Sequence, residues 1–271
     1  MSWSWSLGKP FGIPTKVHLS FVLLLAWVAL SSWFSVPSLL SVGLSLAFTL
    51  AIFATVVLHE LGHALTARAF GIQTRSIVLL PIGGVANLER SPETPKQELL
   101  IAAAGPAVNL AIAGLGGLAY LGLSAIGAGA IGLQFLLAFV VANVILAAFN
   151  MLPAFPLDGG RVFRAAVERK KGRVRATELA AKLGGWFALA FAGFGLFGGN
   201  PVLFLIAPFV WFAGRRELMA VRRQAQVEEM QAARKRAAWN GGRMVMRSAP
   251  GQNPWLSGQY RSPSVSGFWA R

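Results

Sequence analysis

Long runs of apolar residues are the strongest pattern along the chain. Runs that are almost free of charge occupy residues 17–36, 38–58, 99–123, 131–152 and 183–213. About 20 consecutive apolar residues are needed to cross a bilayer as a helix, and the last run is long enough for two short crossings with a turn at 198–201. The pattern therefore predicts an all-α integral membrane protein with about six transmembrane helices.

The segment between the second and third runs predicts a different kind of structure. A helix-compatible sequence continues from the second run to Gly71, a residue typical of the position after a helix end. Residues 77–88 then combine β-branched residues with Pro81, Gly83 and Gly84, which favours a β-hairpin or a re-entrant loop. We therefore expect one non-helical element between the second and third spans.

The fourth run ends in a segment that cannot continue as a regular helix. Pro153 and Pro156 lack the backbone N–H that a helix interior requires, and Gly159-Gly160 favour a tight turn after Asp158. Broken backbone at membrane depth is tolerated where it is buried against protein. We expect a broken helix here, which carries Asp158 toward the cytoplasmic end of the second span.

The distribution of charge adds an orientation to this topology. Only 13% of the residues are charged, against roughly 25% in an ordinary soluble domain. The 25 Lys and Arg residues all fall in the N-terminal lead-in, in residues 64–98 and 153–182, or in the tail. Since cytoplasmic loops are enriched in Lys and Arg, both termini are expected in the cytoplasm. A bacterial inner membrane is the expected location of the protein. The net charge of +15 is then better explained by anionic lipid headgroups than by nucleic acid.

Two of the three histidines lie four residues apart, in the sequence His-Glu-Leu-Gly-His at 59–63. On a helix these positions share one face, so His59 and His63 can bind the same metal ion with Glu60 beside it. Glu60 is then placed to take a proton from an attacking water and to pass one to a leaving amine. The alternative is that both histidines only hydrogen-bond within a helix bundle. It is less favoured, because ionisable residues at bilayer depth are costly without a function.

A catalytic zinc site normally has three protein ligands, so a third must come from elsewhere in the chain. His18 lies at the start of the first span, where an interfacial polar residue is the simpler interpretation. Asp158 is the only aspartate of the chain, and the broken helix directs it toward the paired histidines. It is therefore the better candidate, with an Asp-Gly turn in a surface loop as the alternative.

The histidine motif, together with Asn150 and the sequence Leu-Asp-Gly-Gly-Arg at 157–161, resembles the site-2 protease family of zinc intramembrane metalloproteases, peptidase M50. The sequences at 12–18, 80–86 and 104–109 are similar to the branch that includes sporulation-factor-processing proteases. The resemblance runs from about residue 10 to 165. It implies that Zn²⁺ is bound by three residues and that one carboxylate is the catalytic base: His59, His63 and Asp158, with Glu60.

The resemblance also implies roles for residues around the metal site. Asn150 would position the substrate or stabilise a developing oxyanion, although a helix C-terminal cap explains an asparagine here equally well. Gly83 and Gly84 are expected to bind the substrate, through a strand edge that pairs with an unwound backbone. Asn109 either orients the Asp158 loop or hydrogen-bonds between helices, and the second role is favoured.

The activity implied by the resemblance is the hydrolysis of peptide bonds within or next to transmembrane segments of membrane-anchored proteins. A membrane transporter or metal carrier with the same His/His/Asp site is the alternative, but it leaves Glu60 without a distinct role. Residues 1–214 are expected to form the polytopic membrane metalloprotease domain. Residues 215–271 are expected to form a basic cytoplasmic helix followed by a disordered tail.

Overall fold

The computed structural model describes residues 4–81 and 83–245 of the 271-residue chain. The chain divides into two compact units, residues 1–221 and 222–271. The first unit contains every described strand and the helices up to the first part of the last one. The described part of the second unit is the continuation of that last helix to Val245. Residues 246–271, which are expected to belong to the disordered tail, lie outside the described residues.

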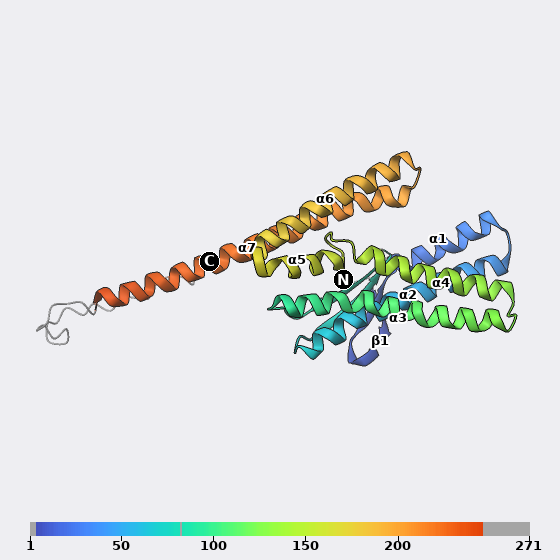
Figure 1. The fold of residues 1–271 in the computed structure, drawn as a ribbon, viewed down its shortest axis with the longest axis horizontal. Coiled ribbons are helices and arrows are strands. Elements are labelled where there is room, and N and C mark those ends of the chain that lie inside the picture. Colours follow the sequence, from blue (N-terminus) through green and yellow to red (C-terminus); the bar gives the residue numbers. More distant parts are fainter. Residues whose placement is uncertain (1–3, 82, 246–271) are drawn as a thin grey trace, which may run out of the picture. The chain divides into compact units, whose positions relative to one another are not determined.

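Helices make up most of the described chain (Figure 1). In chain order they are α1 (Leu19–Ser35), α2 (Leu39–Ala69), α3 (Pro95–Ala125), α4 (Ala130–Asn150), α5 (Asp158–Lys171), α6 (Arg173–Phe197) and α7 (Pro201–Val245). Within the described residues, α2, α3, α4 and α6 are long and apolar enough to cross a membrane. The other two predicted spans correspond to α1 and the apolar start of α7. Helix α1 has 17 residues, which at 1.5 Å per residue reach about 26 Å, somewhat less than the roughly 30 Å hydrocarbon core.

A small four-stranded sheet adds to the predicted all-α architecture. Its strands are β1 (Ser4–Gly8), β2 (Thr15–His18), β3 (Thr74–Leu80) and β4 (Gly83–Leu88), in the order β1-β2-β3-β4. The antiparallel pair of β3 and β4 lies where the sequence favours a hairpin or a re-entrant loop. Strands β1 and β2 were not predicted, because the parallel pairing of β2 with β3 joins distant segments. An exclusively α-helical fold is therefore not what the chain adopts.

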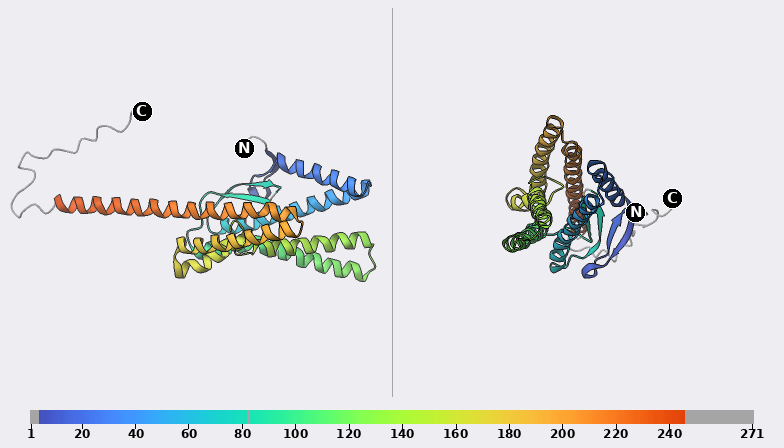
Figure 2. Two further views of the ribbon diagram at one scale, coloured as in Figure 1. Left: turned by 90° about the horizontal axis from the view of Figure 1, so that it is seen from above. Right: turned by 90° about the vertical axis from the view of Figure 1, so that its right-hand side faces the viewer.

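The sheet packs against the end of α2 that carries His59 and His63, as the two views of Figure 2 help to show. Leu61 and Ala64 of α2 share a buried cluster with Ile13, which precedes β2, and Ile77 of β3. On its other side α2 meets α3 very closely. A Cβ at Gly62 would lie 2.9 Å from the Val108 side chain. Helix α2 is thus held between the sheet and α3 at the level of its two histidines.

The chain between α4 and α5 is broken, as the two prolines predict. Residues 151–157 form turns and bends, and α5 begins at Asp158. The expected role of the two glycines is wrong, however, because Gly159 and Gly160 lie in the first turn of α5 without a positive φ. A Cβ at Gly160 would lie 2.7 Å from the carbonyl carbon of Ala154. The glycines therefore allow α5 to pack against the preceding turn, instead of forming a tight turn themselves.

Candidate metal centre

Three side chains from two helices converge at the end of α5 that faces α2. His59 Nε2 lies 3.0 Å and His63 Nε2 lies 3.2 Å from the same oxygen of Asp158, Oδ2. The two Nε2 atoms are 3.1 Å apart. Ligand atoms held about 2.0–2.1 Å from a tetrahedral zinc lie roughly 3.3 Å from each other. The three atoms are therefore spaced as the ligands of one small cation would be.

The space in front of these atoms is kept open by Gly105 of α3. A Cβ at Gly105 would lie 2.6 Å from His59 Nε2 and closer still to the Nε2 atom of His63. Any side chain at this position would fill the volume that an ion between the two imidazoles needs. Two imidazoles and a carboxylate are also a donor set that suits zinc, among other divalent ions. The residues present thus fit a metal ion.

Both imidazoles are anchored through their other ring nitrogen. His59 Nδ1 lies 2.6 Å from Oδ1 of Asn109, and His63 Nδ1 lies 2.6 Å from the backbone oxygen of Ile101. Both partners belong to α3. Histidines that bind a metal through Nε2 commonly donate Nδ1–H to such an oxygen, which fixes the ring. Asn109 also forms the interhelical hydrogen bond favoured from the sequence, to Asn143 of α4, but its contact with His59 was not foreseen.

Asp158 is the first residue of α5, where the helix dipole favours a negative charge. Burial raises the pKa of this carboxyl, but the proximity of His59 and His63 outweighs burial and holds the pKa below its usual range. The side chain is therefore a carboxylate at neutral pH. Because the break in the chain places Asp158 at the N-terminus of α5, its carboxylate is directed at the two histidines of α2.

Glu60 lies on α2 next to the imidazoles and faces β4. A Cβ at Gly84 would lie 2.9 Å from Glu60 Cδ and 3.0 Å from its Oε1. The structure thus brings Gly84 and Glu60 together. Gly83 is different: no described atom lies within 4 Å of a Cβ built there, and its φ of +132° is a conformation that favours glycine. Gly83 therefore shapes the start of β4 without touching the metal centre.

Asn150 is the last residue of α4, at the start of the turn that leads to Asp158. The helix end is capped by the backbone N–H of Met151, which donates to the oxygens of Ala147 and Phe149. This cap does not use the Asn150 amide. The side chain is half-buried and lies near the break in the chain. The described cap of α4 therefore gives no support to the alternative role of Asn150 as a helix C-terminal cap.

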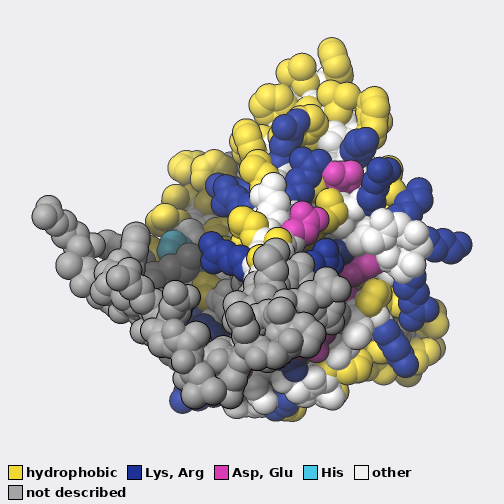
Figure 3. All heavy atoms as spheres, turned by 90° about the vertical axis from the view of Figure 1, so that its left-hand side faces the viewer, with side chains coloured by type: hydrophobic (Ala, Val, Ile, Leu, Met, Phe, Trp, Pro, Cys, Tyr) yellow, Lys and Arg dark blue, Asp and Glu magenta, His cyan; other side chains and the backbone are white. Residues whose placement is uncertain are grey.

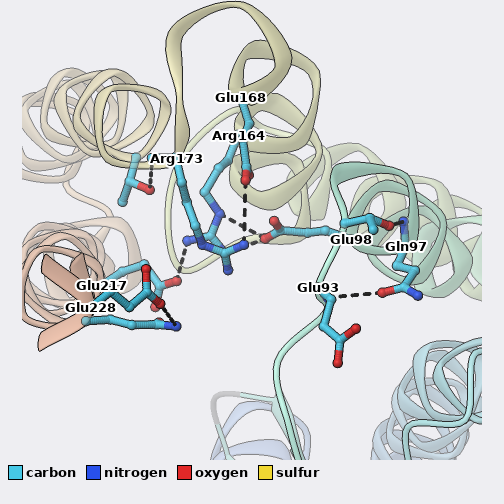
Figure 4. Close-up of polar contacts among 11 residues, drawn as sticks. Glu93, Gln97, Glu98, Arg164, Glu168, Arg173, Glu217 and Glu228 are labelled. Carbon is cyan, nitrogen blue, oxygen red and sulfur yellow. Dashed lines mark hydrogen bonds and ion pairs between the residues drawn. The ribbon is translucent and has the colours of Figure 1, made fainter. Parts of the chain in front are cut away.

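A buried ion cluster, which the sequence analysis missed, holds α5 in place (Figure 4). Arg164 donates to Glu98 of α3, through Nε at 2.9 Å and through Nη2, and to Glu217 of α7 through Nη1 at 2.6 Å. Its guanidinium also lies 4.9 Å from the ring centre of Phe155, in the turn before Asp158. Burial lowers the pKa of Arg164, but the two carboxylates outweigh burial and raise it. Local sequence gives no signal for this cluster, because Arg164 resembles the basic residues around it.

The metal centre falls within the region that known proteins share with this chain. Peptidase family M50 matches residues 47–129 and 117–191. A zinc metalloprotease of Methanocaldococcus jannaschii is 36% identical over 230 residues, which cover 82% of this chain and 62% of the relative. Stage IV sporulation protein FB of Bacillus subtilis is 30% identical over 114 residues, 42% of this chain and 38% of that protein.

Among solved structures, the site-2 protease from Methanocaldococcus jannaschii is similar, with a TM-score of 0.58 and 34% identity. The match covers 80% of this chain and 95% of that one. The chain spans about 62% of the length of the first curated relatives it matches. These findings confirm the resemblance seen in the sequence. Since the family match covers more than half of the 271 residues and includes both histidines and Asp158, this chain belongs to peptidase family M50.

Proposed function

We propose that this chain is an intramembrane zinc metalloprotease that hydrolyses peptide bonds within or next to transmembrane segments of membrane-anchored proteins. One observation carries the proposal: His59, His63 and Asp158 offer ligand atoms within 4.8 Å of one another, with Glu60 beside them. The apolar character of α2, α3, α4 and α6 supports a site within a membrane protein. Relatives that are named zinc metalloprotease and site-2 protease support the reaction class.

In this proposal His59, His63 and Asp158 hold the zinc ion. Zinc, when bound, polarises a peptide carbonyl and increases the acidity of water. Glu60 accepts a proton from the attacking water and returns one to the nitrogen of the departing amine, as a general base and then a general acid. Asn150 donates its amide N–H to the oxygen on which negative charge develops.

The sheet supplies a means to hold the substrate. Strand β4 is at the edge of the described sheet, so one side of its backbone is available to pair with an extended peptide. Gly84 of β4 adjoins Glu60, so a segment paired there would lie next to the catalytic base. A peptide bond in a transmembrane helix is shielded by the helix's own hydrogen bonds, and the substrate must therefore unwind before cleavage. Gly83 and Gly84 allow this segment to approach closely because they have no side chains.

The topology completes the proposal. Six crossings, by α1, α2, α3, α4, α6 and the apolar start of α7, leave both termini in the cytoplasm of a bacterial cell with an inner membrane. Residues 1–214 form the metalloprotease domain, and residues 215–271 form a basic cytoplasmic extension. Lys and Arg side chains are numerous on the face seen in Figure 3. Exposed Arg169, Lys170 and Lys171 at the end of α5 are placed to contact anionic headgroups.

Glu60→Gln tests the proposal against a metal carrier. The full-length protein in detergent is given a membrane-anchored substrate whose transmembrane segment contains small and helix-breaking residues. We expect Glu60→Gln to lower the cleavage rate at least about 100-fold, because the proton transfers are lost, while bound zinc is retained. Glu89→Gln, an exposed glutamate beyond β4, is the matched control and keeps full activity. Metal-dependent cleavage that is unchanged in Glu60→Gln would overturn the proposed mechanism.

A further inference from the structure

A continuous chain of buried hydrogen bonds leads from the backbone of α4 to His59. Nδ2 of Asn143 donates to the backbone oxygen of Phe139 at 2.9 Å. Nδ2 of Asn109 donates to Oδ1 of Asn143 at 2.9 Å, and Oδ1 of Asn109 lies 2.6 Å from His59 Nδ1. Asn143 is 0% and Asn109 1% exposed. Both amides are therefore closed to bulk solvent, and their hydrogen-bond partners lie within the protein.

The backbone carbonyl of Phe139 determines how the two amides in this series of hydrogen bonds are oriented. A backbone carbonyl only accepts, so the end of the Asn143 amide that faces Phe139 must be the NH₂ group. The oxygen of Asn143 then faces Asn109 and accepts from the Asn109 NH₂ group. The oxygen of Asn109 consequently faces His59, and only a protonated Nδ1 can donate to it. In the neutral ring this leaves Nε2 with its lone pair.

A reversed Asn109 amide would have the opposite effect. It would direct its NH₂ group at Nδ1 of His59 and its oxygen at the oxygen of Asn143. Two acceptors would then face each other without water, which costs about 1–3 kcal/mol per unsatisfied buried group. Nδ1 would have to accept, and the ring proton would move to Nε2, the atom that faces Asp158 and His63. A proton on this nitrogen excludes a metal ion from it.

We propose that Asn143 is a positioning residue of the metal centre: through Asn109 it fixes the His59 tautomer that carries its proton on Nδ1, and so presents Nε2 to the metal. The inference rests on the proposed metalloprotease function, for which His59 is a zinc ligand. Asn143 itself lies on α4, and its side-chain hydrogen bonds within the described residues go to Asn109 and Phe139, not to the proposed ligands. Asn143 determines which ring nitrogen of His59 is free of a proton and can bind the metal ion.

The other two histidines supply internal references. His63 donates to the backbone oxygen of Ile101, so its Nδ1-protonated tautomer does not depend on Asn143. His18 caps α1 and accepts from the backbone N–H of Ser20 at its Nδ1. His18 therefore carries its proton on Nε2 when neutral. With only three histidines in the chain, each tautomer can be assigned from one nitrogen spectrum.

The first experiment is NMR of full-length, metal-free protein labelled with ¹⁵N-histidine in detergent, at a pH where the imidazoles are neutral. In the wild type we expect protonated Nδ1 on His59 and His63 and protonated Nε2 on His18. In Asn143→Leu, His59 should become a mixture of tautomers while His63 is unchanged. Asn143→Asp, whose protonated carboxyl can still donate to Phe139 and accept from Asn109, should restore the wild-type pattern. A wild-type His59 that carries its proton on Nε2 would overturn the proposal, even if Asn143→Leu does not fold.

The second experiment measures zinc affinity by competition with a chelator, without any assay of cleavage. Changes that disturb the partners of a metal ligand typically cost about 10- to 100-fold in affinity, and we expect a loss of this size in Asn143→Leu and little loss in Asn143→Asp. Thr177→Val is the matched control, since Thr177 is equally buried and also donates to a carbonyl one turn earlier, that of Arg173. An equal loss in Thr177→Val, or an unchanged affinity in Asn143→Leu, would overturn the inference. Wild-type protein that binds no zinc would instead refute the proposed function.

Discussion

Gly84 of β4 and Glu60 of α2 are packed so closely that a methyl group on Gly84 would lie 2.9 Å from the Glu60 carboxyl carbon. This distance is shorter than any ordinary contact between carbon atoms. The position of the proposed base is therefore linked to the strand proposed to bind the substrate, although the two residues belong to different elements of the fold.

Gly84→Ala should displace Glu60 or push β4 away from α2. Because a displacement of about 1 Å at a catalytic group costs roughly 100-fold in rate, we expect a loss of cleavage of this size with zinc content unchanged. Cleavage of the model substrate and metal analysis of the same sample provide the measurement. Val85→Ala is the control: Val85 is 45% exposed, and side chains alternate between the faces of a strand. Wild-type rates in Gly84→Ala would show that Glu60 does not need its present position.

Gly105→Ala should weaken zinc binding directly. Its new methyl group would occupy the space beside the Nε2 atoms of His59 and His63, and we expect affinity to fall by about 100-fold. Chelator competition measures this change. Gly114→Ala on the same helix should keep wild-type affinity, because no described atom lies within 4 Å of a Cβ at that position. Equal affinities of the two variants would argue against a metal ion in this space.

Asp158→Asn should preserve the size of the third proposed ligand and remove its charge. A neutral amide oxygen is a poor ligand for zinc, so we expect weaker zinc binding and loss of cleavage. A chelator should likewise abolish cleavage by the wild type, and added zinc should restore it, whereas Asp158→Asn should not recover at the same zinc concentration. Glu168→Gln, a carboxylate on the same helix that pairs with Arg173, is the control and should behave as the wild type does.

Arg164→Met should destabilise the first unit by leaving Glu98, which is 3% exposed, without its cation. Loss of one partner from a buried ion pair typically costs about 3–5 kcal/mol. Denaturant unfolding in detergent measures the change. Arg169→Met, an exposed residue of the same helix, should change stability by no more than about 0.5 kcal/mol. The double variant Arg164→Met/Glu98→Leu should recover part of the loss, since the buried charge of Glu98 is then gone and the remaining partner, Glu217, is 35% exposed. If the double variant is as unstable as the single variant, the pair with Glu98 is not the cause.

Local sequence patterns predict the features that depend on neighbouring residues. The spacing of His59 and His63 places both on one helical face, and the prolines at 153 and 156 identify the break before Asp158. The apolar runs identify α2, α3, α4 and α6 as candidate spans. Each of these inferences needs only helix geometry or the chemistry of a single residue type.

Features that depend on distant partners could not be predicted in this way. The pairing of β2 with β3 brings Thr15 beside Ile77, and no short motif indicates it. Asn143 is 34 residues from Asn109, and Arg164 is 66 residues from Glu98. The glycines after Asp158 were misinterpreted for the same reason. Their importance lies in the backbone packed against them, which the sequence alone does not reveal.

Three residues of α3 face the metal centre at intervals of four: Ile101, Gly105 and Asn109. One accepts from His63, one leaves room for the ion and one accepts from His59, yet none is a proposed ligand. A rotation or a slide of α3 along α2 would therefore disturb both imidazoles at once. Zinc affinity in this protein should consequently report on the packing of α2 against α3. It should respond to substitutions along their interface, even far from any coordinating atom.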